Sequence, residues 1–369
     1  YLPTNWLGSV AAVTAQAWRQ HVDGVSLIDP ATRHRYLAGV PLDDLVVVLV
    51  IGETTRHDRM GLFGHDRDTT PYLALEQGLA AFPGRSCDTS TRLSLACMFV
   101  RPTAVRPDPR GGADTVVERD VFSVLRQLGF RIELYALQGE AGFYGRIGVD
   151  EMKVREQLLS EPAHQGKPVH DLLLVDELRA ALARHDERRR SAESTGAARQ
   201  PLLVVLHTKG SHYHYAQRYP ADQAPWQPDC SDPDEACDDA ALLNAYDNSV
   251  RYVDTMLQAV RDSVRSRRAW VVYSADHGES IGGGMHFHAT PKAVAPPEQF
   301  KVPLLFWASP GFLADPLLAN RHQRLMERAR QAPPDRHGHH ELFATMLGCL
   351  GVHSPDGGID PALDLCAGP

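Results

Sequence analysis

The chain has 369 residues, of which 43% are hydrophobic and 23% are charged, and its formal net charge is −8 at pH 7. It can bury a large core, and no apolar run approaches the roughly 20 residues that cross a bilayer. The negative charge disfavours nucleic acid as a partner, because binding to a phosphate backbone depends on clustered Lys and Arg. Because the chain begins at Tyr1 without a methionine or signal peptide, we expect a mature or excised piece of a longer protein.

The first predicted elements are a helix and a buried strand. Residues 5–20 form the helix, and residues 45–51 are seven apolar, mostly β-branched residues typical of a strand buried on both faces of a parallel sheet. Glu53 follows this strand, at the edge where open α/β sheets bind ligands. A buried carboxylate needs a partner. That partner is either a metal cation, Arg56 or the start of a helix.

Strands and helices then alternate along the chain. A capping box of Thr115 and Glu118 predicts a helix that ends at Leu128, and the polar segment 187–200 is expected to be a loop with no packed face. Further strands are predicted at 131–137, 201–207, 268–274 and 301–307, and further helices at 171–185, 246–264 and 339–351. This alternation predicts an α/β fold with a mostly parallel central sheet covered by helices on both faces.

Side chains that bind metals collect where the predicted strands end. They are Glu53, then His207 and His212, then Asp276 and His277, with His286 and His288 following after a Gly-rich loop. A single histidine is more often an ordinary core or surface residue, but carboxylate and imidazole groups at one edge of a sheet suit Zn²⁺. The HGHH run at 337–340 is interpreted as a solvated entry to the last helix.

A cluster of hydroxyl groups offers a nucleophile. Thr89, Ser90, Thr91 and Ser94 lie between two cysteines, and a zinc hydrolase uses either an activated water or an activated side-chain hydroxyl. The residue types do not choose among the four hydroxyls. A Ser/Thr-rich start of a helix explains the same residues without any catalysis.

The six cysteines are spaced as three neighbouring pairs, which are Cys87 with Cys97, Cys230 with Cys237, and Cys349 with Cys366. Other connectivities are open, and six reduced thiols in a cytosolic enzyme are the alternative. The order favours three local disulfides and an oxidising compartment such as the periplasm.

Seven motifs resemble those of the bacterial phosphoethanolamine transferases, inner-membrane enzymes that modify lipid A and the lipopolysaccharide core and include the transferable colistin-resistance proteins. The motifs are GETTR (52–56), GLFGHDRDTTP (61–71), CDTSTRLSLACMF (87–99), HTKGSHYHYAQRYP (207–220), YDNSVRYVD (246–254), SADHGES (274–280) and HATPKAVAP (288–296). The resemblance implies the alkaline phosphatase/sulfatase fold for a catalytic domain at 41–369. It also implies a juxtamembrane helix and linker at 1–40, tethered to a preceding membrane domain at the periplasmic face of the inner membrane.

The resemblance also implies roles for particular residues. Thr91 matches the nucleophilic threonine, which transfers phosphoethanolamine from phosphatidylethanolamine to lipid A or the lipopolysaccharide core through a covalent intermediate. Glu53, Thr91, Asp276 and His277 match the ligands of a catalytic Zn²⁺. His212 and His288 match histidines that bind a second zinc or the phosphoryl oxygens, and two of the cysteine pairs, 87 with 97 and 230 with 237, match family disulfides.

The sequence departs from the family pattern at several positions. Ala96 replaces a proline, Arg92 replaces a small residue beside the nucleophile, and the family's substrate-binding lysine after the strand at 131–137 has no counterpart, for which Arg146 is a candidate substitute. A phosphoglycerol transferase or phosphatase of the same fold is one alternative function. A metal-stabilised module that binds glycolipid without turnover is another, whereas a sulfatase is disfavoured because the C/S-x-P-x-R motif is absent.

Overall fold

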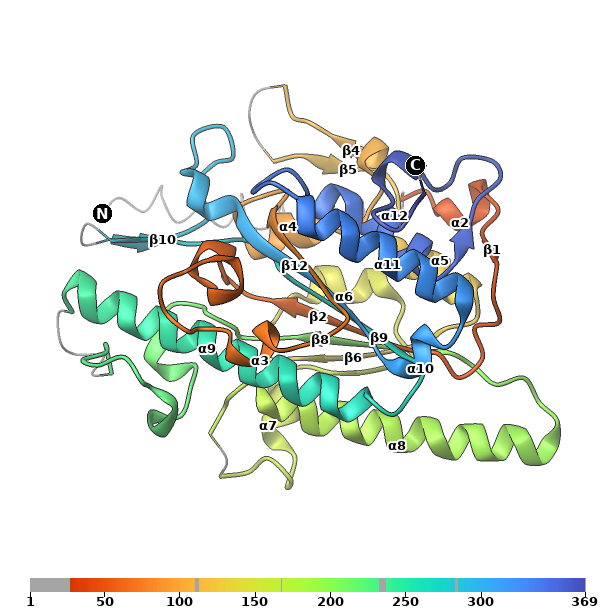
Figure 1. Ribbon diagram of the computed structural model, residues 1–369, viewed down its shortest axis with the longest axis horizontal. Helices are drawn as coiled ribbons and strands as arrows, with labels where there is room; N and C mark the ends of the chain where they lie inside the picture. The colour runs from red at the N-terminus through yellow and green to blue at the C-terminus, as the bar shows by residue number, and fades with distance from the viewer. Residues whose placement is uncertain (1–26, 110–112, 167, 232–236, 283–284, 369) are drawn as a thin grey trace, which may run out of the picture.

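A seven-stranded sheet forms the centre of the protein (Figure 1). The computed structural model describes residues 27–109, 113–166, 168–231, 237–282 and 285–368. The strand order is β3-β12-β9-β2-β8-β6-β7, and β12 alone runs antiparallel to its neighbours among these described strands. The predicted α/β fold with a mostly parallel sheet is confirmed.

The predicted strands lie within one or two residues of their expected positions. The sheet consists of β2 (Val46–Gly52), β3 (Leu79–Arg85), β6 (Arg131–Ala136), β7 (Glu151–Lys153), β8 (Leu202–His207), β9 (Ala269–Ala275) and β12 (Lys301–Ala308). The two unpredicted strands, β3 and β7, are edge strands. β3 contains Pro83 and Gly84, which weaken a strand pattern, and β7 is too short to show one.

Alternate residues of β2 face two separate cores. Val47, Leu49 and Ile51 face the first core, while Val46, Val48 and Val50 face the second. The first core is covered mainly by α4 (Thr91–Cys97), α5 (Val121–Gln127), α6 (Ala141–Ile147), α11 (Pro316–Gln331) and α12 (Leu342–Cys349), and the second by α3 (Pro71–Ala74), α8 (Leu172–Thr195) and α9 (Asp239–Val264). A strand buried on both faces has no polar side, which explains the unbroken apolar run of β2.

The predicted helix at 115–128 begins too early. Thr115 and Val116 form strand β5, which pairs with β4 (Val105–Arg106), and α5 begins only after its N-cap residue Asp120. The carboxylate of Glu118 accepts two hydrogen bonds from Arg101, at 2.8 and 2.7 Å, so it is not available to close a capping box. β-pairing of the β-branched residues therefore outweighs the local capping signal.

The predicted loop at 187–200 is wrong over most of its length. Helix α8 continues to Thr195 and ends at Gly196, whose φ of 70° lies in the left-handed region. Arg188 of this segment donates a 3.0 Å hydrogen bond to Glu133, which is fully buried in β6. The first half of α8 packs apolar side chains in the second core, and an ion pair to the sheet holds its polar second half.

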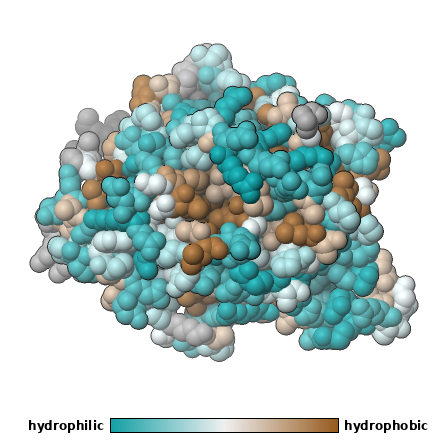
Figure 2. All heavy atoms as spheres, viewed as in Figure 1, coloured by the Kyte–Doolittle hydropathy of each residue, from teal (hydrophilic) through white to brown (hydrophobic). Residues whose placement is uncertain are grey.

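The described part of the expected N-terminal linker packs against the end of the chain. Strand β1 (Leu37–Ala38) pairs with β13 (Val352–His353), and Tyr36 and Val40 are buried in the first core. The helix expected at 5–20 lies outside the described residues. No described helix is long and apolar enough to cross a membrane. Hydrophilic side chains cover most of the face seen in Figure 2, with a smaller apolar group near its middle.

Candidate active site

Two neighbouring parallel strands bring three metal-type side chains together. Gly52 of β2 pairs with Ala275 of β9, so the next residues, Glu53 and Asp276, leave the sheet side by side. His277 follows, with its Nε2 3.3 Å from Oε1 of Glu53 and 3.5 Å from Oδ2 of Asp276. All three residues are buried, and one ligand atom from each lies within 4.8 Å of the others.

Glu53, Asp276 and His277 form a triad, and the hydrogen bonds around it leave nitrogen and oxygen atoms free to bind a cation. Nδ1 of His277 donates to the carbonyl of Gly278 at 2.8 Å, so the Nε2 lone pair faces the two carboxylates when the ring is neutral. Oδ1 of Asp276 accepts from the backbone amides of Thr54 and His277, at 3.2 and 2.8 Å. Oδ2 of Asp276 is buried without a hydrogen-bond partner in the described structure, an arrangement that a metal ligand explains. These oxygen and nitrogen donors fit Zn²⁺.

The charges of the triad depend on one another. Burial lowers the pKa of His277, but the carboxylates of Asp276 and Glu53 outweigh burial and raise it to about 10. Burial and the charge of Glu53 raise the pKa of Asp276 to about 7. Burial also raises the pKa of Glu53, yet its hydrogen bond to His277 and the charge of that ring bring the pKa well below its usual range. Without a metal, a proton on His277 therefore compensates the carboxylates, and a divalent cation would displace that proton.

Of the predicted hydroxyl cluster, Thr91 contacts the triad. It is the first residue of α4, and its Oγ1 lies 3.2 Å from Oε2 of Glu53 and 3.3 Å from Nε2 of His277. The hydroxyl of Thr89 instead donates to the carbonyl of Thr290 at 2.6 Å, and that of Ser94 to the carbonyl of Asp88 at 3.0 Å. The geometry thus distinguishes Thr91, which contacts the triad, from Thr89 and Ser94, whose hydroxyls bond the backbone. The residue types alone did not make this distinction.

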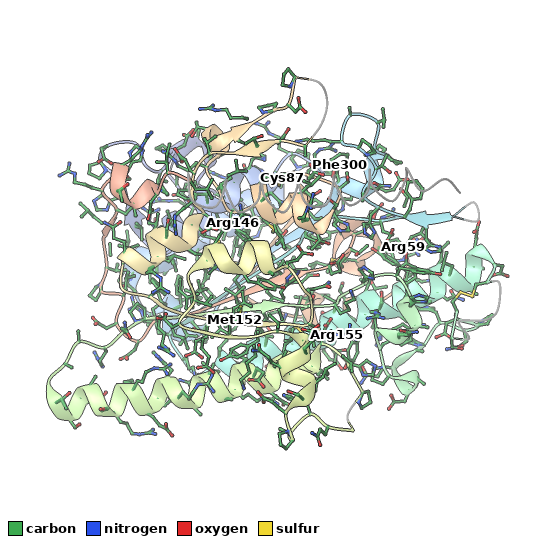
Figure 3. The ribbon with its side chains drawn as sticks, turned by 180° about the vertical axis from the view of Figure 1, so that it is seen from behind. Arg59, Cys87, Arg146, Met152, Arg155 and Phe300 are labelled. Carbon is green, nitrogen blue, oxygen red and sulfur yellow. A yellow bond between two sulfur atoms is a disulfide. The ribbon has the colours of Figure 1, made fainter. Side chains whose placement is uncertain are left out.

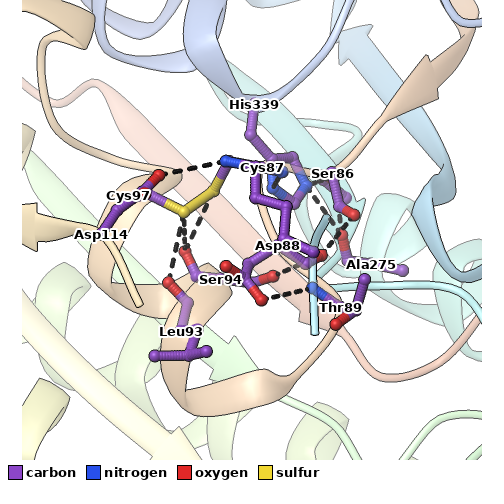
Figure 4. Close-up of a disulfide and its surroundings, with 12 residues drawn as sticks. Ser86, Cys87, Asp88, Thr89, Leu93, Ser94, Cys97, Asp114, Ala275 and His339 are labelled. Carbon is purple, nitrogen blue, oxygen red and sulfur yellow. Dashed lines mark hydrogen bonds and ion pairs between the residues drawn. A yellow bond between two sulfur atoms is a disulfide. The ribbon is translucent and has the colours of Figure 1, made fainter. Parts of the chain in front are cut away.

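A disulfide closes the segment that carries Thr91 (Figure 4). Cys87 lies four residues before α4 and Cys97 is its last residue, so the bridge ties the end of this short helix to the segment that leads into it. The other two predicted pairs, Cys230 with Cys237 and Cys349 with Cys366, are also bonded, and the described residues include no free cysteine. The three local disulfides expected from the cysteine order are confirmed.

The predicted pair of histidines lies beside the triad. The ring of His288 is 4.4 Å from that of His277 and 5.9 Å from that of His212, measured between ring centroids. Nδ1 of His288 faces the buried carboxylate of Glu279 at 3.3 Å, so its Nε2 is left for another partner. His207 is not in the group of ligand atoms that lie within 4.8 Å of one another; its Nδ1 pairs with the hydroxyl of Tyr144 at 2.7 Å, and its Nε2 is buried without a hydrogen-bond partner in the described structure.

His286, the remaining histidine of the predicted cluster, contacts an aromatic side chain instead. It lies on β11 (Met285–Phe287), which pairs with β10 (Ser280–Gly282), and its ring stacks on Tyr213 with centroids 3.8 Å apart. Tyr213 adjoins His212, and His286 is two residues from His288. The stack therefore holds the two segments of the histidine pair together.

Sequence reasoning missed a lysine and a glutamine in the site. Gln138 lies two residues after β6, and its amide donates a 2.7 Å hydrogen bond to Oε2 of Glu53. The ammonium of Lys209 donates to Oε1 of the same glutamine at 3.0 Å. Burial lowers the pKa of Lys209, and the nearby charge of Glu53 opposes that shift. Both residues follow strand ends, which was the available signal, and Lys209 lies within the recognised HTKGSH motif.

Arg146, the candidate substitute for the missing lysine, does not join this group. It lies on α6, with its guanidinium over the ring of Phe143 at 6.0 Å (Figure 3). Burial lowers its pKa, and Asp120 is the acidic group that opposes this shift. The structure therefore brings Lys209, rather than Arg146, to the metal-type triad.

The solvated entry predicted at 337–340 is wrong for most of the run, because Gly338 and His339 are buried and His337 is partly buried, whereas His340 is exposed. His339 is fully buried, and its ring contacts both the backbone before Asp276 and the backbone of Cys87. The run of histidines in HGHH signalled metal binding or exposure, whereas this ring forms hydrogen bonds between two segments of the site.

Comparison with known proteins agrees with this geometry. The sulfatase family model matches residues 46–352. The chain is 46% identical over 366 residues to the Kdo(2)-lipid A phosphoethanolamine 7''-transferase of Escherichia coli K12, an alignment that covers 99% of this chain and 62% of the relative. It is 31% identical to the phosphatidylethanolamine transferase Mcr-1 of Escherichia coli, over 71% of this chain and 48% of that protein.

The fold of the chain also matches the solved structure of a phosphoethanolamine transferase domain. The soluble domain of lipooligosaccharide phosphoethanolamine transferase A from Neisseria meningitidis superposes with a TM-score of 0.74 at 27% identity, covering 93% of this chain and 99% of that one. The chain spans less than two thirds of the length of its curated relatives in these alignments. On the family model, the sheet and the site at its edge, the chain belongs to the sulfatase family and is similar within it to phosphoethanolamine transferases, including the soluble domain of one of them.

Proposed function

We propose that the chain is the catalytic domain of a zinc-dependent phosphoethanolamine transferase that forms a covalent intermediate on Thr91. One observation carries this proposal: the Thr91 hydroxyl lies within 3.3 Å of both Glu53 and His277, two members of the buried triad. The relatives' names support phosphoethanolamine as the transferred group.

The reaction has two displacement steps. In the first, Oγ1 of Thr91 forms a bond to the phosphorus of phosphatidylethanolamine, the bond between phosphorus and the diacylglycerol oxygen breaks, and that oxygen takes the hydroxyl proton. In the second, a hydroxyl oxygen of the acceptor attacks the same phosphorus and the bond to Thr91 breaks. The threonine oxygen then regains a proton from the acceptor hydroxyl. Each step exchanges one phosphoester bond for another, so neither water nor a redox partner is consumed.

Glu53, Asp276, His277 and Thr91 would hold Zn²⁺, and a zinc ion bound there lowers the pKa of the threonine hydroxyl and stabilises negative charge on the phosphoryl group. We assign His212 and His288 to the non-bridging phosphoryl oxygens or to a second zinc, because they adjoin the triad on one side. We assign Lys209 to the phosphate of the substrate, since its ammonium is fixed by Gln138 beside Glu53.

We further propose that the acceptor is a Kdo sugar of a lipid A glycolipid. The support is the name of the relative that is 46% identical over 99% of this chain. We also propose a setting at the periplasmic face of the inner membrane, with a membrane domain preceding residue 1. The support is the likeness to the full-length lipooligosaccharide phosphoethanolamine transferase A of Neisseria meningitidis, an integral membrane protein, and the three disulfides fit an oxidising compartment.

The test follows the covalent intermediate. Purified chain is loaded with zinc, exposed to a dispersed phosphatidylethanolamine and analysed by intact-protein mass spectrometry and fragmentation. We expect one added phosphoethanolamine on Thr91, together with released diacylglycerol. Thr91→Ala should give neither, whereas Ser90→Ala should give both, because the Ser90 side chain makes no capping hydrogen bond and is not placed at the triad. An adduct on Ser90 or Ser94, or donor turnover by Thr91→Ala at the wild-type rate, contradicts the mechanism.

A further inference from the structure

His339 connects two segments of the active site that are far apart in the sequence (Figure 4). Its Nδ1 accepts a 3.2 Å hydrogen bond from the backbone amide of Cys87. Cys87 is the first residue of the segment 87–97 that carries Thr91, here called the nucleophile segment. Its Nε2 lies 3.0 Å from the carbonyl of Ala275 and 3.1 Å from the hydroxyl of Ser274, at the end of β9. Ala275 immediately precedes Asp276 and Cys87 lies four residues before Thr91, so the ring links the backbone next to a metal-type residue with the backbone that leads to the proposed nucleophile.

The partners of the ring determine its tautomer. A backbone amide can only donate, so Nδ1 must be unprotonated, and the hydrogen then lies on Nε2, where the Ala275 carbonyl accepts it. The ring is fully buried, and burial lowers its pKa to about 3, so the neutral form persists at ordinary pH. In this tautomer the neutral ring accepts the hydrogen bond from the Cys87 amide and donates one to the Ala275 carbonyl.

The segment that carries His339 is itself firmly held. The amide of Arg85 donates to the carbonyl of His337 at 2.9 Å, and Oε2 of Glu341 accepts from the amide of Gly338 at 2.9 Å. A side chain at Gly338 would meet the carbonyl oxygen of Arg85 at 2.2 Å, so the two backbones pack too closely for any other residue. The ring therefore has a fixed base from which to position its two partners.

We propose that His339 is a positioning residue that sets the separation between the Thr91 segment and Asp276 through its two ring nitrogens. The Nε2 side fixes the backbone from which Asp276 extends, and the Nδ1 side fixes the backbone of Cys87 at the start of the nucleophile segment. The inference rests on the proposed function, because it assumes that Asp276 holds zinc and that Thr91 reacts. A histidine that merely fills space would affect stability without separating these two effects.

Two substitutions each retain one half of the ring. The Asn oxygen in His339→Asn replaces Nδ1 and leaves the Ala275 carbonyl with only the Ser274 hydroxyl as a donor, at 3.1 Å. The Gln nitrogen in His339→Gln replaces Nε2 and leaves the Cys87 amide without its acceptor. His322→Gln is the matched control, because His322 is a buried histidine of α11 whose Nε2 bonds the carbonyl of Gly78 at 2.7 Å, outside the site.

The readouts are zinc affinity, by competition with a chelator, and hydrogen exchange of the Cys87 amide, neither of which depends on phosphoryl transfer. We expect His339→Asn to weaken zinc binding about 10-fold, within the range for loss of a group that orients a metal ligand. We expect His339→Gln to keep near wild-type zinc affinity, to speed exchange at Cys87 and to lower kcat without raising KM. The control should lose stability and change neither readout.

The outcomes separate this inference from the proposed function. Equal effects of the two variants on zinc affinity and on Cys87 exchange, or no effect of either, would overturn the positioning role even if the transferase reaction proceeds. If the variants do not fold, nitrogen-15 NMR of the wild-type protein measures the tautomer of His339. A hydrogen on Nδ1 at neutral pH would overturn the proposal. If both readouts behave as expected but no donor is consumed, the positioning role stands and the assigned reaction fails.

Discussion

Gln138 donates its 2.7 Å hydrogen bond to the same oxygen of Glu53 that faces the hydroxyl of Thr91. The other end of the Gln138 amide accepts from Lys209, so a cation is linked to the triad through one neutral side chain. A lysine in direct contact with Glu53 would compete with a metal for the carboxylate. Because the Lys209 ammonium bonds Gln138 instead, its other N–H groups can donate to a substrate phosphate.

This relationship predicts the effect of Lys209→Met. The variant loses one charge-assisted hydrogen bond to the substrate, worth about 1.5 to 3 kcal/mol, so kcat/KM for phosphatidylethanolamine should fall roughly 10- to 100-fold. Zinc content should not change, because Lys209 contacts no residue of the triad directly. Steady-state release of diacylglycerol and metal analysis measure the two quantities.

Lys153→Met is the control for loss of a lysine charge. Lys153 lies on edge strand β7, where it pairs with Glu161 and Glu177 at 2.8 and 3.0 Å. It should lower stability and leave kcat/KM unaltered. A drop in transfer that is as large for Lys153→Met as for Lys209→Met would show that Lys209 has no specific role.

The proposed zinc ligands should differ in how much zinc is lost when each is replaced. Asp276→Ala removes a triad carboxylate whose free oxygen is buried without a partner, so we expect loss of the tightly bound zinc. His288→Ala removes a ring that adjoins the triad but is held by Glu279, and it should keep that zinc and weaken only a second site or the substrate. Zinc per chain after dialysis against a weak chelator measures this difference. Equal loss in both variants would contradict the ranking.

The sequence predicted the sheet and the triad for the same physical reason. β2, β8 and β9 are mostly apolar runs, and parallel strands end at one edge, so Glu53 and Asp276 were expected at that edge. The pairing of β2 with β9 in the structure makes them neighbours. Lys209, Gln138 and His339 escaped prediction because their roles depend on hydrogen bonds between segments distant in sequence. Periodicity and local motifs carry no information about such contacts.

The errors in the helices have a related cause. The polar segment after residue 186 was expected to be a loop, yet α8 continues because Arg188 reaches a buried carboxylate on β6. The capping box at Thr115 failed because Glu118 binds Arg101. In both cases a tertiary ion pair outweighed the local signal.

Removal of the Cys87–Cys97 or the Cys349–Cys366 disulfide should lower stability by a similar amount, but only removal of the first should reduce transfer activity. Cys87 and Cys97 are 10 residues apart and Cys349 and Cys366 are 17 apart, so loop entropy gives about 3 kcal/mol for each bridge. Replacing either pair by alanines should lower the free energy of unfolding by about that amount. Only the 87/97 variant should also lose transfer activity, because that bridge ties the end of α4, which begins with Thr91, to the segment that leads into the helix. Urea unfolding and donor turnover test both statements, and full activity in the 87/97 variant would refute the second.

Asp254 predicts a pH dependence of stability that is independent of the active site. It lies on α9, and its two carboxylate oxygens accept from the backbone amides of Tyr72 and Leu73, at 2.8 and 2.9 Å. Burial raises its pKa to about 6, although these two bonds and the charges of Arg261 and Arg251 oppose the shift. The folded state therefore holds a proton that the unfolded state has already released at the same pH.

The sign of the effect follows from this difference in bound protons. Stability from Asp254 is fully present below the ordinary aspartate pKa near 4 and is lost as the pH rises through about 6. Relative to Asp254→Asn, which does not titrate, the wild type should lose on the order of 2 to 3 kcal/mol of unfolding free energy between pH 4 and pH 7. Urea unfolding of both proteins at several pH values in this window gives the difference directly, and any constant cost of the asparagine cancels. Parallel stability profiles would mean that the two amide donors keep Asp254 ionised and that burial does not control its charge.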